Sequence, residues 1–195
     1  MSIAAPAVLA DAIPRSAARN VLLVIGGAAF VGLSAQVAIP LPFTPVPLTG
    51  QTFAVLLTAA ALGMWRGAAS MSLYAVAGLA GVPWFAGGSS AFKGGALVAS
   101  FGYVLGFIAA AALVGWLAER GATRTALRTA GLMVLGNVVI YAIGATWLAN
   151  AIGVSLQRAV ELGVTPFLVG DALKVALAAG LFPLAWRAVD RFTSK

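Results

Sequence analysis

One long uncharged stretch decides the fold: VLLVIGGAAFVGLSAQVAIPLPFTPVPLTGQTFAVLLTAAALGMW, from Val21 to Trp65. A membrane-spanning helix needs about 20 apolar residues, so this stretch is too long for one helix. The run IPLPFTPVP from Ile39 to Pro47 divides it, because alternating prolines cannot stand in a helix interior. We therefore predict a first helix over 20–38 and a second over 50–65.

The composition places the whole chain in a membrane. Hydrophobic residues make up 62% of the 195 residues and charged residues 9%, with a mean hydropathy of +1.02. Soluble domains carry about 25% charged residues, and a soluble fold of this length would not bury so much apolar surface. The chain is therefore predicted to be an integral membrane protein in contact with the lipid bilayer.

The residue types that are missing narrow the chemistry. The sequence has no cysteine, no histidine and five acidic residues, which disfavours disulfides, metal centres and catalysis by a thiol or an imidazole. The tract from Gly87 to Lys93 lacks the second glycine that a phosphate-binding loop places before its lysine. We expect no enzymatic activity, no metal, and no ATP site or other cofactor in this chain.

Four further apolar intervals complete the membrane domain. Three of them carry no charge, and the last is interrupted only by Asp171 and Lys174. They predict helices over 67–80, 96–118, 129–150 and 166–187. The prediction is thus an all-α bundle of six transmembrane helices over 20–187, with flanks over 1–19 and 188–195. The second and third helices are short and are expected to meet in a tight turn at Trp65–Gly67.

The basic residues predict the orientation of the bundle. With six helices and a cytoplasmic N-terminus, the outer segments carry only Lys93 and Arg158, whereas the cytoplasmic segments carry Arg15, Arg19, Arg66, Arg120, Arg124, Arg128, Arg187, Arg191 and Lys195. Basic residues accumulate in cytoplasmic loops, so both termini are predicted to be cytoplasmic. The net charge of +7 is explained by this topology, and no nucleic-acid partner is expected.

Asp171 and Lys174 are the first candidates for a functional site. Thr165 is a plausible N-cap and Pro166 a plausible first residue of the sixth helix, which places both charges within two turns of its outer end. Their spacing of three puts them on one helix face. A charge inside the membrane is costly, so such residues face the bundle interior or an aqueous cavity. Two interpretations stay open: a self-neutralising pair that locks helices together, and a polar ligand site that opens outward.

The uncharged outer loops are the second feature that requires an explanation. Irregular backbone near membrane depth is tolerated where it is buried or lines a cavity, and glycine lets such backbone approach a ligand closely. The loop between the third and fourth helices is either an interfacial aromatic belt or a ligand lid, and we favour the lid. Its candidate residues are Trp84, Phe85, Gly87, Gly88, Phe92 and Lys93.

Polar and small residues on the helices add further candidates. Thr49, Gln51 and Tyr141 are placed to join a site, whereas Gln36 and Asn137 are expected to make hydrogen bonds between helices. The spacing Ala28-xxx-Gly32 allows close helix approach, either inside the bundle or against another membrane subunit.

Five tracts of the sequence resemble those of the BioY family, the substrate-binding S-components of biotin energy-coupling-factor transporters. They cover nearly the whole chain and stand in the family's order: Ile39–Val55, Gly81–Gly88, Phe101–Phe107, Tyr141–Leu148 and Pro166–Lys174. The resemblance implies a six-helix S-component fold in the cytoplasmic membrane of a bacterium or archaeon. It also implies biotin binding from outside, with a membrane coupling subunit and cytoplasmic ATPase subunits as partners.

The resemblance also assigns residues. It implies that Asp171 and Lys174 form the family's acidic and basic pair, that Lys93 is its basic loop residue, and that the coupling subunit docks at Ala28 and Gly32. The complete predicted substrate site is Asp171, Lys174, Lys93, Phe85, Gly87, Gly88, Phe92, Tyr141, Thr49 and Gln51.

Two alternative functions remain at this point. One is a stand-alone secondary or facilitated transporter of a small carboxylate vitamin, with Asp171 carrying protons in the secondary mechanism. The other is a membrane assembly factor in which the charged pair is purely structural. Association of the chain with a second copy of itself is also left open.

Overall fold

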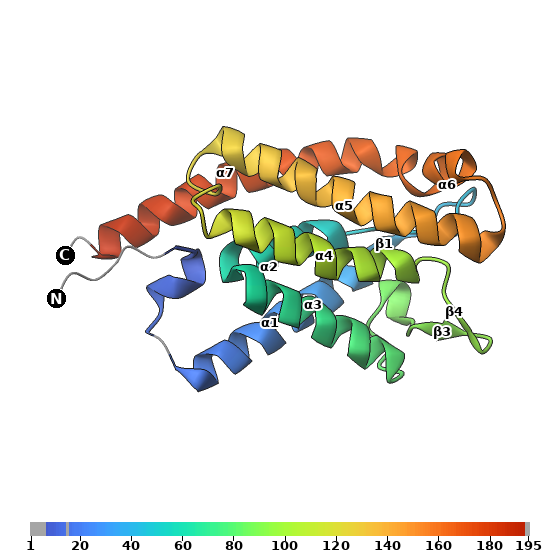
Figure 1. Cartoon of the computed structure of the whole chain (residues 1–195), viewed down its shortest axis with the longest axis horizontal. Coiled ribbons are helices and arrows are strands. Elements are labelled where there is room, and N and C mark those ends of the chain that lie inside the picture. The colour runs from blue at the N-terminus through green and yellow to red at the C-terminus, as the bar shows by residue number, and fades with distance from the viewer. Residues whose placement is uncertain (1–6, 15, 194–195) are drawn as a thin grey trace.

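The computed structural model describes residues 7–14 and 16–193, and they form a bundle of roughly aligned helices (Figure 1). All six predicted helices are present. Their bounds are α1 Ala17–Gln36, α2 Gln51–Leu62, α3 Met64–Leu79, α4 Phe101–Ala118, α5 Ala126–Ile152 and α7 Leu168–Thr193. The fold class predicted from the sequence, an all-α membrane bundle, is confirmed.

Shorter elements lie between these helices. Two small antiparallel hairpins pair β1 Ala38–Ile39 with β2 Leu48–Thr49, and β3 Phe92–Lys93 with β4 Ala96–Leu97. The remaining elements are the helix α6 Leu156–Gly163 and the 3₁₀ turns η1 Leu9–Ala12, η2 Ala86–Gly88 and η3 Thr165–Phe167.

The helices differ in their ability to cross a membrane. Long, apolar segments are Ala17–Gln36, Phe101–Ala118, Ala126–Ile152 and the combined region Leu156–Arg191. Helix α2 has 12 residues and α3 has 16, which at a rise of about 1.5 Å per residue gives lengths well below the hydrocarbon thickness of about 30 Å. The predicted shortness of the second and third helices is therefore confirmed.

The turn between α2 and α3 lies earlier than predicted, at Gly63 instead of Trp65–Gly67. Gly63 has φ +86°, a conformation that favours glycine. The Glu119 carboxylate accepts a hydrogen bond of 2.8 Å from the Met64 amide and so caps the start of α3. Arg66 is consequently a buried residue inside α3, where its guanidinium donates to the Leu62 carbonyl and to Asp11.

Two other boundaries also differ from the sequence prediction. Helix α4 begins at Phe101 and not at residue 96, because Ala96 and Leu97 pair with β3 around the positive-φ residues Gly94 and Gly95. Residues 151–165, expected as a loop, contain α6, whose Ser155 N-cap accepts from the Arg158 amide.

The last predicted helix begins and ends later than expected. Thr165 and Pro166 lie in η3, where the Thr165 hydroxyl donates to Val160 instead of capping α7. Helix α7 continues to Thr193, so 188–193, predicted as a tail, belong to the helix.

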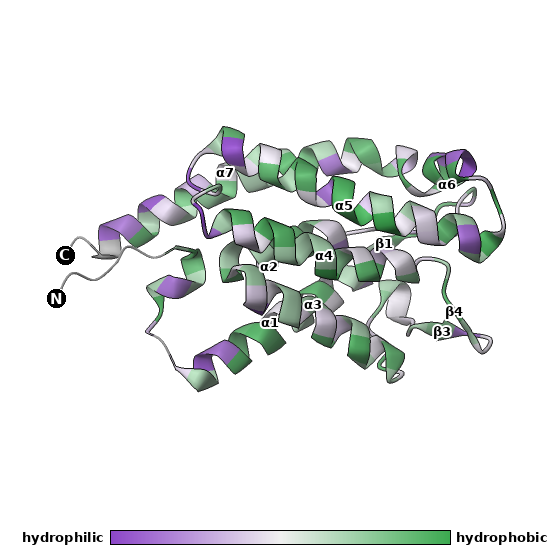
Figure 2. Cartoon of the chain, in the orientation of Figure 1, coloured by the Kyte–Doolittle hydropathy of each residue, from purple (hydrophilic) through white to green (hydrophobic). Residues whose placement is uncertain are grey.

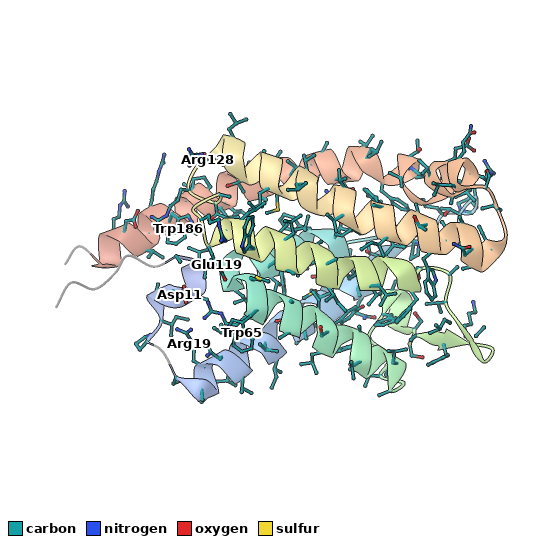
Figure 3. The ribbon with its side chains drawn as sticks, viewed as in Figure 1. Asp11, Arg19, Trp65, Glu119, Arg128 and Trp186 are labelled. Atoms are coloured by element: carbon teal, nitrogen blue, oxygen red, sulfur yellow. The ribbon has the colours of Figure 1, made fainter. Side chains whose placement is uncertain are left out.

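The two ends of the bundle have different chemistry. The turn η1 and the last turns of α7 lie at one end, where Asp11, Arg19, Trp65, Glu119, Arg128 and Trp186 also gather, and the hydrophilic colours concentrate toward the ends of the helices (Figures 1, 2 and 3). We call Asp11, Arg19 and Arg66 the inner cluster: Asp11 Oδ1 lies 2.9 Å from Arg66 and 3.8 Å from Arg19, and both arginines are buried. The hairpin β3–β4 and helix α6 lie at the opposite end (Figure 1).

Helix α4 forms the centre of the bundle and packs against α2, α3 and α5. Small residues make these contacts close. A Cβ atom on Gly106 would lie 3.0 Å from the backbone of Ile140 on α5, and one on Gly102 would overlap the Trp147 side chain. This packing places the first turns of α2, α4 and α7 around a common space at the end of the bundle away from η1.

Candidate ligand pocket

A pocket opens between the first turns of α2, α4 and α7, with η2 at its edge and Tyr141 of α5 on its wall. It has about 620 Å³ of empty space when its open mouth is included. Its lining residues are Val46, Pro47, Leu48, Thr49, Gln51, Thr52, Phe85, Ala86, Ser89, Ser100, Tyr103, Val104, Phe107, Tyr141, Phe167, Asp171 and Lys174.

Lys174 and Asp171 form the polar centre of the pocket. Lys174 Nζ donates to Thr52 Oγ1 at 2.8 Å, to the Thr49 carbonyl oxygen at 3.0 Å and to Asp171 Oδ1 at 3.1 Å. The Tyr141 hydroxyl donates to Asp171 Oδ2. The spacing of three on α7 aligns the two charges, and β2, α2 and α5 supply their other partners.

The charged pair is well removed from solvent. The side chains of Asp171 and Lys174 are 7% and 18% exposed, and the other residues of this part of α7 are apolar. Removing charges from water costs several kcal/mol per ion unless each finds a partner and hydrogen bonds. The pair meets this condition, and both residues also line the pocket.

The walls of the pocket are apolar and aromatic. Phe85 is 4% exposed, and its ring lies 5.0 Å from that of Tyr74 and 6.4 Å from that of Phe101. Across the pocket, Tyr103 donates to the Gly163 carbonyl at 2.9 Å and meets the Tyr141 ring edge-on. The pocket therefore offers one charged, hydrogen-bonding end and a rigid aromatic body.

The structure brings together six of the predicted site residues: Asp171, Lys174, Tyr141, Thr49, Gln51 and Phe85 all line the pocket. Thr49 contributes its backbone carbonyl. The Gln51 side-chain amide donates a hydrogen bond of 2.8 Å to the Tyr74 hydroxyl, so this side chain also connects α2 with α3.

The other predicted residues lie outside the pocket. Lys93 and Gly87 line an adjoining vestibule that shares Pro47, Ala86, Ser89 and Ser100 with the pocket. Phe92 is 47% exposed on β3, and neither it nor Gly88 lines the pocket or the vestibule. Phe92 lies in the hairpin β3–β4 and Gly88 in η2.

Trp84 belongs to the packing of the bundle and not to the pocket. Its indole nitrogen donates to the Tyr74 carbonyl at 3.0 Å, and its ring lies over Gly32 of α1. The Gln36 amide donates to the Gly32 carbonyl of its own helix at 2.9 Å and to the carbonyl of Trp84, in the loop after α3, at 3.3 Å, so it does not make the expected bond between helices. Asn137, expected to make a similar bond, has a buried Oδ1 atom without a hydrogen-bond partner among the described residues.

The residues predicted to dock the coupling subunit, Ala28 and Gly32, do not lie on the surface of the bundle. Ala28 is fully buried and Gly32 lies under Trp84, so both residues pack inside the bundle. The small-residue spacing therefore reports internal packing. The outward face of α1 instead carries Leu22, Gly26, Phe30 and Leu33, and Gly26 has open space around its Cα.

Sequence reasoning missed several pocket residues, of which Thr52 and Tyr103 matter most. Thr52 stands three residues after Thr49, so the helical spacing from a residue already singled out would have pointed to it. Tyr103 lies in the first turn of α4, within the tract Phe101–Phe107 that resembles the BioY family, but its residue type alone did not indicate a binding role. Ser89, Ser100, Phe107 and Phe167 carried no signal beyond their position in loops or apolar helices.

Fold and pocket together define a multi-pass membrane protein with a small-molecule site at one end of its bundle. The model of the BioY family matches residues 7–191. The chain belongs to the BioY family.

Relatives with assigned names span archaea and bacteria. The chain is 37% identical to a probable biotin transporter BioY of Pyrococcus horikoshii, over 83% of this chain and 92% of that protein. It is 36% identical to the biotin transporter BioY of Thermotoga maritima, over 72% of this chain and 81% of that protein. It shares its fold with the crystal structure of the S-component for biotin from an ECF-type ABC transporter: the TM-score is 0.77 at 19% identity, over 89% of this chain and 95% of that one.

Proposed function

We propose that this protein binds biotin and supports its uptake across the cytoplasmic membrane, as the substrate-specificity subunit of an energy-coupling-factor transporter. Membership of the BioY family and the names of the relatives support this function. The single observation that carries it is the hydrogen-bonded cluster of the buried Asp171 with Lys174, Tyr141 and Thr52, which lines a pocket that also carries aromatic and aliphatic side chains.

The pocket matches the chemistry of biotin group by group. Biotin has a planar ureido group with two N–H donors and one carbonyl acceptor, an apolar thiophane ring and a valerate carboxylate. Asp171 accepts from a ureido N–H, and Lys174 donates to the ureido carbonyl. Phe85, Phe107 and Phe167 surround the apolar ring. The valerate chain points to the vestibule, where Lys93 pairs with its carboxylate.

Energy for uptake comes from other subunits. The sequence has no phosphate-binding loop, so ATP is hydrolysed by cytoplasmic ATPase subunits that act through a membrane coupling subunit. The end with η1 and the exposed Arg120, Arg128 and Arg187 faces the cytoplasm, in agreement with the preference of basic residues for that side. The role is transport and not catalysis.

Equilibrium binding of labelled biotin to the detergent-purified chain tests the proposal. Wild type is expected to bind, and Asp171→Asn and Lys174→Ala are expected to lose binding. Asp190→Asn is the matched control, because it makes the same change on the same helix at an exposed position far from the pocket. A folded wild-type protein that fails to bind biotin would refute the proposal.

Uptake assays separate coupled from stand-alone transport. In a strain that lacks every coupling ATPase, the proposed S-component role predicts that uptake falls to background. Uptake that continues there, and that collapses with the proton gradient, would instead support a secondary transporter.

A further inference from the structure

The hydrogen-bonding capacity of the Lys174 ammonium group is already filled by the protein. An ammonium group donates three hydrogen bonds, and Nζ has three acceptors: Thr52 Oγ1, the Thr49 carbonyl oxygen and Asp171 Oδ1. Thr52 lies in the first turn of α2, Thr49 lies in β2, and Asp171 lies on α7 with Lys174 itself. A ligand oxygen that accepts from Lys174 must therefore replace one of the three.

Asp171 differs from Lys174 in this respect. An ionised carboxylate accepts about four hydrogen bonds, and Asp171 receives three: from Lys174 at 3.1 Å, from the Thr52 hydroxyl at 3.5 Å and from the Tyr141 hydroxyl. One acceptor position remains for a ligand N–H. Binding at Asp171 thus needs no exchange of partners, whereas binding at Lys174 does.

Thr52 is the partner that Lys174 can release at least cost. Releasing Asp171 would leave a buried carboxylate without its counter-charge, which is strongly unfavourable. The Thr49 carbonyl belongs to a backbone held by the pairing of Thr49 with Ala38. The Thr52 hydroxyl already donates to Asp171 Oδ1 at 3.5 Å, so it keeps a hydrogen-bond partner when it releases Lys174.

We propose that Thr52 is a competing acceptor that sets the affinity of the pocket. When biotin binds, its ureido carbonyl oxygen takes the place of Thr52 Oγ1 on Lys174, and the Thr52 hydroxyl turns fully to Asp171. Part of the binding free energy is spent on this exchange, and the bound state has one contact fewer between α2 and α7. The inference rests on the proposed function, since it assumes that the ligand carbonyl reaches Lys174.

Removing the competitor is expected to strengthen binding. Thr52→Val keeps the shape of the side chain and deletes its hydroxyl. One N–H of Lys174 then has no acceptor until the ligand carbonyl binds to it. The net value of one hydrogen bond corresponds to a factor of about two to ten in affinity, and Thr52→Val should bind biotin tighter by this factor. Thr52→Ala, which also lacks the hydroxyl, is the second variant and should also bind more tightly.

Two control variants restrict the interpretation. Thr52→Ser retains a competing hydroxyl, so it should not show the gain in affinity expected of the two variants that lack the hydroxyl. Thr58→Val makes the same chemical change at another buried threonine of α2 that lies outside the pocket, and should leave affinity unchanged. Affinities are measured by titrating labelled biotin into the detergent-purified full chain, and the folded state is checked by size-exclusion chromatography.

The outcomes are distinct. Tighter binding by Thr52→Val and Thr52→Ala, with no gain in affinity for either control, supports the exchange. Unchanged affinity would mean that Lys174 keeps its partners, weaker affinity would make Thr52 a direct ligand contact, and a gain shared by Thr58→Val would reflect a general loosening of α2. Each of these three results overturns the inference. Failure of wild type to bind biotin refutes the proposed function instead.

Discussion

Replacing Lys174 alone and together with Asp171 separates the structural from the functional role of the buried pair. Lys174→Met removes the ammonium group while keeping a long apolar side chain. Asp171, 5% exposed, then loses its counter-charge, and the Thr49 carbonyl and Thr52 hydroxyl lose a donor. Breaking one partner of a buried pair costs about 3–5 kcal/mol. The pocket gives partial access to water, so we expect the lower limit, about 3 kcal/mol.

The double variant Asp171→Leu/Lys174→Met should behave differently. It removes both charges together with their desolvation penalty, and such replacements in other proteins are neutral or stabilising by about 1–4 kcal/mol. We therefore expect its stability to equal or exceed that of wild type. Both variants should lose biotin binding, because both lack the charged ends that hold the ureido group.

Thermal unfolding in detergent, followed by loss of the monomer peak in size-exclusion chromatography, measures the difference. For a chain of this size about 1 kcal/mol corresponds to a shift of about 2–4 °C in Tm, so Lys174→Met should unfold about 6–12 °C below wild type. A single variant with an unchanged Tm would show that the pair is well hydrated. A double variant as unstable as the single one would show that the pair stabilises the fold, and would refute the reasoning.

Three further variants test other parts of the molecule. Gly102→Ala should lower Tm because its new Cβ atom overlaps Trp147 with a cost of about 1–3 kcal/mol, whereas Gly131→Ala, with open space around it, should leave Tm unchanged or raise it. Asp11→Asn should speed proteolysis of the N-terminal segment, since the two buried arginines of the inner cluster lose their carboxylate; a wild-type digestion rate would contradict this. Lys93→Ala should weaken binding of biotin in a salt-dependent way and leave binding of biotin methyl ester unchanged, because the exposed vestibule holds only the carboxylate.

The amino-acid sequence by itself determined the class of the protein and the number of its main helices. Lengths of uncharged sequence set the spans, since hydrocarbon excludes charge, and the prolines between Ile39 and Pro47 separated the first two. The same reasoning found Asp171 and Lys174, because charges in an apolar helix stand out without any knowledge of their neighbours. Helix ends were less certain where a glycine turn or a short hairpin competed with helix, as at Gly63 and β4.

The tertiary structure decided which residues share the site. Thr52 and Tyr103 enter the pocket because α2 and α4 begin beside α7, a neighbourhood that no local pattern contains. For the same reason Trp84 is a packing residue whose ring covers Gly32, although we expected Trp84 in a ligand lid and Gly32 on a docking face. The sequence shows which residues are costly to place in the membrane, but it does not show which partners offset that cost. For Lys174 these partners are Asp171, three residues away, and Thr49 and Thr52, which are more than a hundred residues away. Only the packing of the helices brings those partners together.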